Sequence, residues 1–268
     1  MNPLDNLIEE VNELVLSFRS APIVGTLETL GFTQYMFWFL VALVVTTVLV
    51  FKFKKKQSES LVPKGTFVNA MEFVVEYVRD DICKGVLGET WKKHFPILMT
   101  IFMVIVVNNL IGLIPGCKTG TGTISITGAL ATVAFCYSVW VGVKKRGGLG
   151  YIKSLAPAGV PFPINIVVWA IEVFSTLLRL VTLAIRLFCN MFAGHVVMGT
   201  FAILAALFVE PALAAFSAAT AIQSGASILW VAILTAIYAV ELMVAVIQAY
   251  VFTLLTAVYI QISEADEH

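Results

Sequence analysis

Two apolar stretches in the C-terminal half are each too long to be an ordinary membrane span. They cover about residues 164–209 and 214–262, and Glu210-Pro211 divides them. Since a helix rises 1.5 Å per residue, forty-odd residues reach roughly 65 Å, about twice the hydrocarbon thickness of a bilayer. Each stretch must either fold back as a hairpin or run as one steeply inclined helix. Neither contains a Gly-Pro or Asn-Gly turn or an internal basic cluster, so we expect two long tilted helices over 164–262.

The composition places the whole chain in a membrane. Of its 268 residues, 59% are hydrophobic and only 13% are charged, a balance that a soluble domain of this size does not tolerate. The formal net charge is zero, so no basic excess indicates a nucleic-acid partner. The four cysteines are far apart and have the spacing of neither metal ligands nor a redox pair. We therefore expect an all-α polytopic membrane protein of five or six helices, with no metal and no cofactor.

Basic clusters predict how this single membrane domain, residues 1–268, is oriented. The first span, 35–51, is followed at once by Lys52 and three further lysines. The positive-inside rule places that end in the cytoplasm and the segment 1–34 outside. A second cluster, Lys144-Lys145-Arg146, follows a later span and places that end in the cytoplasm as well. The N-terminus is thus expected outside and the C-terminus in the cytoplasm.

The chain between the two basic clusters is expected to hold three helices. Residues 65–91 alternate apolar and charged side chains at helical spacing, which predicts an amphipathic helix at the cytoplasmic interface. Residues 95–143 form a two-span hairpin with a turn-rich external loop. Asn108 and Asn109 fall near the outer end of its first arm. They are either hydrogen-bonded interhelical amides or the polar lining of an outward-facing aqueous path, and the sequence leaves both open.

One polar stripe runs along the first long stretch. Asn165, Glu172, Arg179 and Arg186 follow one another in steps of seven residues, each step drifting about 20° around a helix, and Asn190 lies one turn beyond Arg186. An arginine within a span costs roughly 2.5 to 3.5 kcal/mol to insert and cannot lose its proton. Two arginines against one glutamate leave surplus positive charge, so we expect Arg186 to face an external anion. The alternative is that Glu172 neutralises Arg179, or that a partner helix buries the stripe.

The second long stretch carries a counterpart stripe around Glu241. Gln248 lies about 20° from Glu241 around a helix, so the two stripes are able to face each other. His195 lies about 140° from Glu172, away from the arginine face. A lone histidine in an apolar helix is usually a satisfied core residue, and a lone glutamate is usually paired or protonated. The alternative is a titratable pair that relays protons.

Three runs of the sequence resemble subunit a of F-type ATP synthases. They are Ile185 to His195, Gln248 to Tyr259 and Asn108 to Pro115, and the resemblance covers the chain from the first span onward. It implies that Arg186 faces a ring of c subunits against which the two long helices pack. It also implies that five matching positions line two aqueous half-channels or lie beside the arginine: Glu172, Asn190, His195, Glu241 and Gln248.

The resemblance implies a function and a set of partners. The chain would be the proton-translocating stator subunit of an H⁺-transporting two-sector ATPase in a bacterial plasma membrane, without an active site of its own. Its partners would be the c-subunit ring, the b-subunit peripheral stalk, the remaining ATP synthase subunits, the lipid bilayer and protons. Two departures from family patterns involve three positions. Relative to some bacterial members, His195 and Glu241 are exchanged, which suggests that the two side chains meet. Cys189 stands where many relatives carry glycine or alanine.

The chemistry of Arg186 is consistent with that role. A carboxylate on a moving partner must be protonated while it faces lipid, yet it must release the proton at the stator. A permanent cation favours the ionised carboxylate, and arginine, unlike lysine, does not carry the proton itself. The pairing must stay hydrated, because separating a dry buried ion pair costs about 3 to 5 kcal/mol.

Two other classes of protein fit the sequence less well. A secondary ion-coupled transporter also buries charges at mid-membrane, but such folds usually show inverted repeats with broken helices, and the sequence has no internal repeat. An intramembrane hydrolase needs a nucleophile with its base or paired aspartates, and no aspartate lies in any expected span. No phosphate-binding glycine loop is present either.

Overall fold

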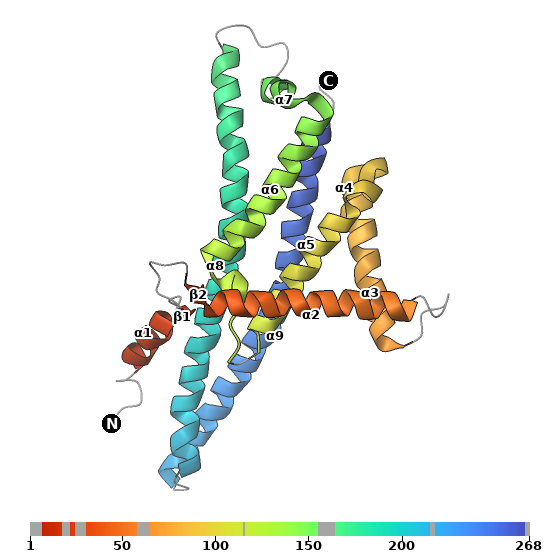
Figure 1. The fold of residues 1–268 in the computed structure, drawn as a ribbon. Coiled ribbons are helices and arrows are strands. Elements are labelled where there is room, and N and C mark those ends of the chain that lie inside the picture. The colour runs from red at the N-terminus through yellow and green to blue at the C-terminus, as the bar shows by residue number, and fades with distance from the viewer. Residues whose placement is uncertain are drawn as a thin grey trace.

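The structure is a computed structural model that describes residues 7–17, 22–24, 31–57, 65–114, 116–154, 164–214 and 218–265. These residues are almost entirely helical, which confirms the expected all-α polytopic class (Figure 1). Within them, five helical segments are long and apolar enough to cross a membrane.

The elements follow in chain order. They are α1 (Leu7–Ser17), β1 (Pro22–Val24), β2 (Phe32–Thr33), α2 (Gln34–Gln57), α3 (Thr66–Tyr77), the π-helix η1 (Val78–Lys84), α4 (Gly85–Leu87), the 3₁₀-helix η2 (Gly88–Thr90), α5 (Trp91–Gly112), the 3₁₀-helix η3 (Gly120–Gly122), α6 (Ile124–Arg146), α7 (Gly148–Ser154), α8 (Ile164–Ala214) and α9 (Ala218–Glu264). The short strands β1 and β2 pair antiparallel, with Pro22 opposite Thr33.

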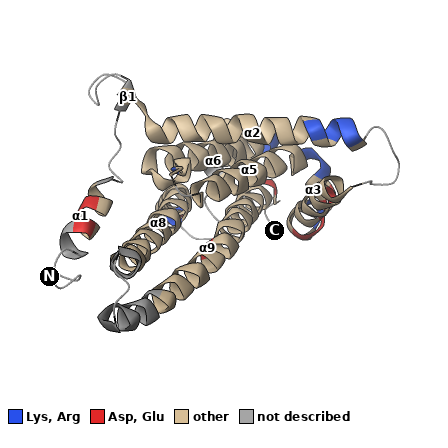
Figure 2. Ribbon diagram, turned by 90° about the horizontal axis from the view of Figure 1, so that it is seen from below, with Lys and Arg blue, Asp and Glu red and all other residues tan. Residues whose placement is uncertain are grey.

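Helix α2 continues beyond the apolar run that marks the first span. It extends to Gln57 and carries Lys54, Lys55 and Lys56 in its last turn. Lysine is a good helix former, and its charge is favourable at a helix C-terminus. Figure 2 shows this basic end of α2 as a single blue block, far from the acidic residues of α1.

Residues 66–90 form α3, η1, α4 and η2 in direct succession, and α5 begins at Trp91. One face is buried through Val68, Met71 and Val78. The opposite face carries exposed ion pairs, with Asp80 Oδ2 2.8 Å from Arg79 and Asp80 Oδ1 2.7 Å from Lys84. The segment is therefore amphipathic, while its place at a membrane interface stays a prediction.

Helices α8 and α9 run for 51 and 47 residues, so each long stretch is a single helix and not a hairpin. The two helices lie side by side and cross α2 at a large angle (Figure 1). Helix α6 packs against both of them, and α5 packs against α9. The core lies where these helices meet, and its fully buried members include Leu98, Ile105, Leu187, Phe252 and Ile260.

Candidate functional site

Arg186 is exposed on the outer face of α8. Its neighbours Leu183 and Leu187 are buried, at 2% and 0% exposure, whereas Ile185 and Cys189 are exposed. Within the part of the chain that the structure describes, its guanidinium forms no hydrogen bond or ion pair, in contrast with that of Arg179. The packing thus turns this cation away from the rest of the chain.

Glu172 and Arg179 form an ion pair on the same helix. Arg179 Nη2 lies 3.0 Å from Glu172 Oε1, and the guanidinium carbon lies 5.7 Å from the ring centroid of Tyr259 on α9. The glutamate therefore offsets one arginine of the stripe. Arg186 remains as the surplus positive charge.

A polar cavity of about 250 Å³ surrounds this ion pair. Its lining comes from α6, α7, α8 and the end of α9, and includes Arg146, Tyr151, Glu172, Arg179 and Ser263. Arg146 Nη1 donates to Ser154 Oγ over 2.6 Å. We call this the α7-side cavity.

A second cavity lies further along α8, around His195. It has a volume of about 260 Å³ and is lined by Gly112, Lys118, His195 and Tyr238, among others, with Leu14 of α1 on its rim. A smaller cavity of about 30 Å³ shares Lys118 and His195 and reaches Tyr35. Burial lowers the pKa of Lys118 from its ordinary value. We call these two spaces together the His195 cavity.

Two glycines make room for the titratable groups near this cavity. A Cβ on Gly112 would lie 3.1 Å from His195 Nε2 and 2.5 Å from Thr119 Cβ. A Cβ on Gly194 would overlap the carboxylate of Glu241. Glu241 therefore lies directly against the α8 backbone, at the residue that precedes His195. The two helices are this close only because Gly194 has no side chain.

Asn190 and Gln248 are polar groups within the packed helices. Asn190 is half-buried and Gln248 is 7% exposed. Asn190 Nδ2 and Gln248 Nε2 are both buried, and neither has a hydrogen-bond partner in the described part of the protein. Buried amides of this kind usually bind water or another polar group. The structure thus places polar groups of both predicted stripes among the packed helices.

Asn108 and Asn109 are fully buried, and their side chains bind η3. Asn108 Oδ1 accepts from the Gly120 amide over 3.1 Å, and Asn109 Oδ1 accepts from Thr121 Oγ1 over 2.8 Å. Asn109 Nδ2 also donates to the Ala245 carbonyl on α9 over 3.2 Å. Of the two roles that the sequence left open, this geometry favours hydrogen-bonded amides that join helices over a polar lining of an aqueous path.

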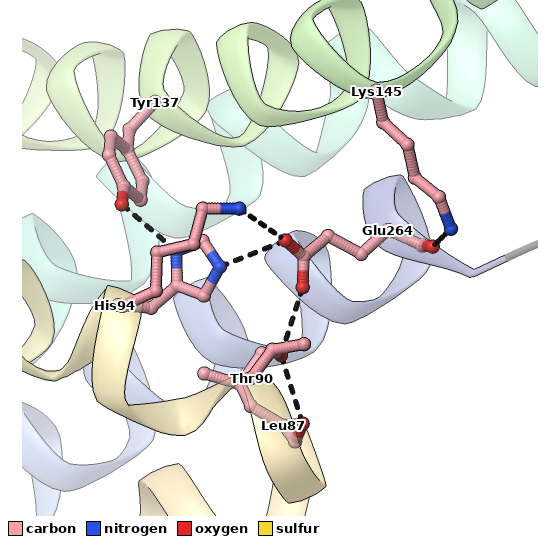
Figure 3. A network of polar contacts seen from close by, with 7 residues as sticks. Leu87, Thr90, His94, Tyr137, Lys145 and Glu264 are labelled. Carbon is pink, nitrogen blue, oxygen red and sulfur yellow. Dashed lines mark hydrogen bonds and ion pairs between the residues drawn. The ribbon is translucent and has the colours of Figure 1, made fainter.

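One polar network contains residues that the sequence did not single out. Its centre is His94 of α5, whose Nδ1 lies 2.9 Å from Tyr137 Oη on α6 and whose Nε2 lies 3.0 Å from Glu264 Oε1 at the end of α9 (Figure 3). The partners are 43 and 170 residues away in the chain. The helical periodicity of the sequence does not predict contacts between residues so far apart in the chain. Among the described residues, no cluster of three or more His, Cys, Asp or Glu side chains is suited to a metal ion.

These features define a polytopic all-α membrane protein whose longest helix carries an exposed arginine between two cavities that contain titratable side chains. Residues 35–261 match the family model described as the ATP synthase A chain. The chain belongs to that family.

Three relatives named ATP synthase subunit a illustrate the similarity. The one from Gluconobacter oxydans is 36% identical over 94% of this chain and 95% of its own length. The one from Nitrobacter hamburgensis is 36% identical over 87% of this chain and 88% of its own length. The one from Chlorobium phaeobacteroides is 37% identical over 85% of this chain, but this chain spans only 62% of that longer relative.

Proposed function

We propose that this chain is the proton-translocating stator subunit of an F-type ATP synthase, and that Arg186 acts on a carboxylate of the rotating c-subunit ring. The observation that carries the proposal is the position of Arg186, an exposed cation on a membrane helix without a described partner in its own chain. Family membership supports the same role. The chain has no active site of its own in this proposal.

The apolar surface of α8 and α9 is suited to a membrane-embedded partner. The most apolar stretch of α8 and that of α9 each bury few of their residues. Their exposed large side chains include Phe174, Leu178, Val181, Leu242 and Met243. A ring of apolar helices covers such a surface without exposing it to water, and a carboxylate on that ring would meet Arg186. The b-subunit stalk and the remaining ATP synthase subunits would complete the assembly.

Arg186 would favour the ionised form of each carboxylate that reaches it. A nearby cation lowers the pKa of a carboxyl group, whereas lipid favours the protonated form. The proton therefore leaves at the arginine and returns before the carboxylate moves into lipid. Since arginine stays protonated, it blocks direct passage of protons along the stator.

The two cavities would be the half-channels on either side of Arg186. Glu172, in the α7-side cavity, lies 14 residues before Arg186, or about 21 Å along the helix, and His195 lies 9 residues after it, or about 13 Å. His195 and Glu241 would pass protons in the outer half-channel. Asn190 and Gln248 would bind water beside the arginine. Asn108 and Asn109 would support the outer half-channel by holding its loop.

The proposed orientation follows the basic clusters. The N-terminus lies outside and the C-terminus in the cytoplasm of a bacterial plasma membrane, because Lys54 to Lys56 and Lys144 to Arg146 end α2 and α6. A secondary transporter is the rival class. Such folds place their site at discontinuous helices, whereas α8 and α9 are continuous.

Replacing Arg186 by lysine tests the proposal. We expect Arg186→Lys to abolish ATP synthesis driven by a proton gradient in membrane vesicles while the complex still assembles, because lysine keeps the charge but is able to give up its proton. Arg179→Lys is the matched control, since Glu172 is able to pair with either cation. ATP synthesis that persists in Arg186→Lys would refute the role of Arg186.

A further inference from the structure

A basic cavity lies at the end of α6, on the side that the topology assigns to the cytoplasm. Its volume is about 340 Å³, and it is lined by Thr90, Lys93, Val141, Lys144, Lys145 and Glu264. Three lysines thus face one carboxylate. In the sequence, Lys92 adjoins this lining on the basic side, and Glu89 and Asp266 adjoin it on the acidic side. We call this space the three-lysine cavity.

The one carboxylate of the cavity is already occupied by donors from its own chain. Glu264 Oε1 lies 2.9 Å from Lys93 Nζ and 3.0 Å from His94 Nε2, and Glu264 Oε2 accepts from Thr90 Oγ1 over 3.0 Å (Figure 3). Lys145 Nζ donates to the Glu264 backbone carbonyl at the same place. Glu264 therefore offsets only part of the positive charge. An anion that enters the cavity meets a net positive lining.

The surface next to the cavity has the features of a membrane interface. Lys144 Nζ lies 5.0 Å from the ring centroid of Trp140, and Trp140 is 51% exposed. Helix α7, which follows α6 and lines the neighbouring α7-side cavity, exposes Leu149 at 79% and Ile152 at 50%. Exposed tryptophan with lysine at the end of a span is typical of the headgroup level of a bilayer. The cavity therefore lies beside a surface suited to lipid acyl chains.

We propose that the three-lysine cavity binds the phosphate headgroup of an anionic membrane lipid in the cytoplasmic leaflet. Basic pockets between membrane helices on the cytoplasmic side recognise such headgroups. Glu264 engages one N–H of Lys93, and an ammonium has three. The acyl chains would lie along Trp140. The bound lipid would brace α5 and α6 around the C-terminal end of α9, and this inference does not depend on the role of Arg186.

Quenching of Trp140 fluorescence by brominated lipid tests the site. The full chain is reconstituted in phosphatidylcholine vesicles after the other four tryptophans are replaced by phenylalanine: Trp38, Trp91, Trp169 and Trp230. A small share of the lipid carries bromine on its acyl chains, either as phosphatidylglycerol or as phosphatidylcholine. We expect the phosphatidylglycerol form to quench more strongly, and Lys144→Gln or Lys93→Gln to lower that preference about fivefold each.

Lys54→Gln is the matched control, because it removes the same charge from the basic end of α2 and should leave the preference unchanged. Equal quenching by both lipids, or a loss in Lys54→Gln as large as in Lys144→Gln, overturns the proposal. If inorganic phosphate abolishes the preference for phosphatidylglycerol and sulfate at equal ionic strength does not, the cavity binds free phosphate and the proposal of a lipid site is overturned.

Native mass spectrometry of the chain with its natural tryptophans repeats the comparison without the four replacements. The proposal requires phosphatidylglycerol to remain bound to the wild-type chain and to Lys54→Gln, and to be lost from Lys144→Gln. Equal retention by all three chains would contradict it.

Discussion

At the scale of single residues, missing side chains decide where the titratable groups lie. Gly194 leaves space for the Glu241 carboxylate, and Gly112 leaves space for His195 and Thr119. The motif around Arg186 is visible in the sequence, and so are His195 and Glu241 as candidates. The role of the two glycines is not visible in the sequence, because the sequence does not say which side chain of a neighbouring helix fills the space beside a glycine.

Gly194→Ala should impair proton-driven ATP synthesis strongly. The new methyl group would overlap Glu241, and overpacking of this kind costs about 1 to 3 kcal/mol or displaces the side chain. Adding Glu241→Asp should restore part of the activity, because a shorter acid vacates the space. Gly128→Ala on α6 is the control, since a Cβ there meets nothing within 4 Å. Activity of Gly194→Ala equal to that of the control would contradict this account.

Exchange of His195 and Glu241 should retain more function than either single replacement by alanine. Glu241 lies against Gly194, so the two titratable groups are placed in one region and the double exchange keeps both there. Proton pumping driven by ATP hydrolysis in inverted vesicles measures the outcome. An exchanged chain that pumps no better than both alanine variants would argue against a shared proton path.

At the scale of elements, the length of α8 and α9 is predictable and their pairing is not. An uninterrupted apolar run predicts a long helix, because the helix satisfies its own backbone hydrogen bonds in lipid. The polar stripe of α8 is likewise visible as a seven-residue repeat. Which faces pack against α6 and which remain exposed depends on shape, and the structure leaves Arg186 on the exposed side.

Cys189 offers a native test of the proposed rotor-facing surface. It is exposed on α8, three residues beyond Arg186 and about 60° from it around the helix. We expect it to form a disulfide with a cysteine introduced near the essential carboxylate of the c subunit. Cys136, exposed on α6, is the control and should not crosslink. Crosslinking through Cys136 alone, detected on non-reducing gels, would move the rotor interface to α6.

At the scale of the whole molecule, the proposed topology places the His195 cavity outside and the α7-side cavity in the cytoplasm. Cys117 lines the His195 cavity and is half-buried. A membrane-impermeant maleimide should therefore label it in right-side-out vesicles, whereas Lys54→Cys should be labelled only in inverted ones. Cys117→Ser supplies the background. Labelling of Cys117 from the cytoplasmic side alone would invert the topology.

The sequence by itself determined the membrane class, the two long helices, the expected orientation and the surplus charge of Arg186. Hydropathy, basic clusters and helical period are local properties that do not depend on the rest of the fold. The tertiary structure alone decided the links between distant segments. Asn109 binds α9, His94 joins Tyr137 to Glu264, and three lysines from two helices share one cavity. Such contacts depend on how helices cross, because side chains far apart in the chain become neighbours only when packing sets the angle and register of each pair.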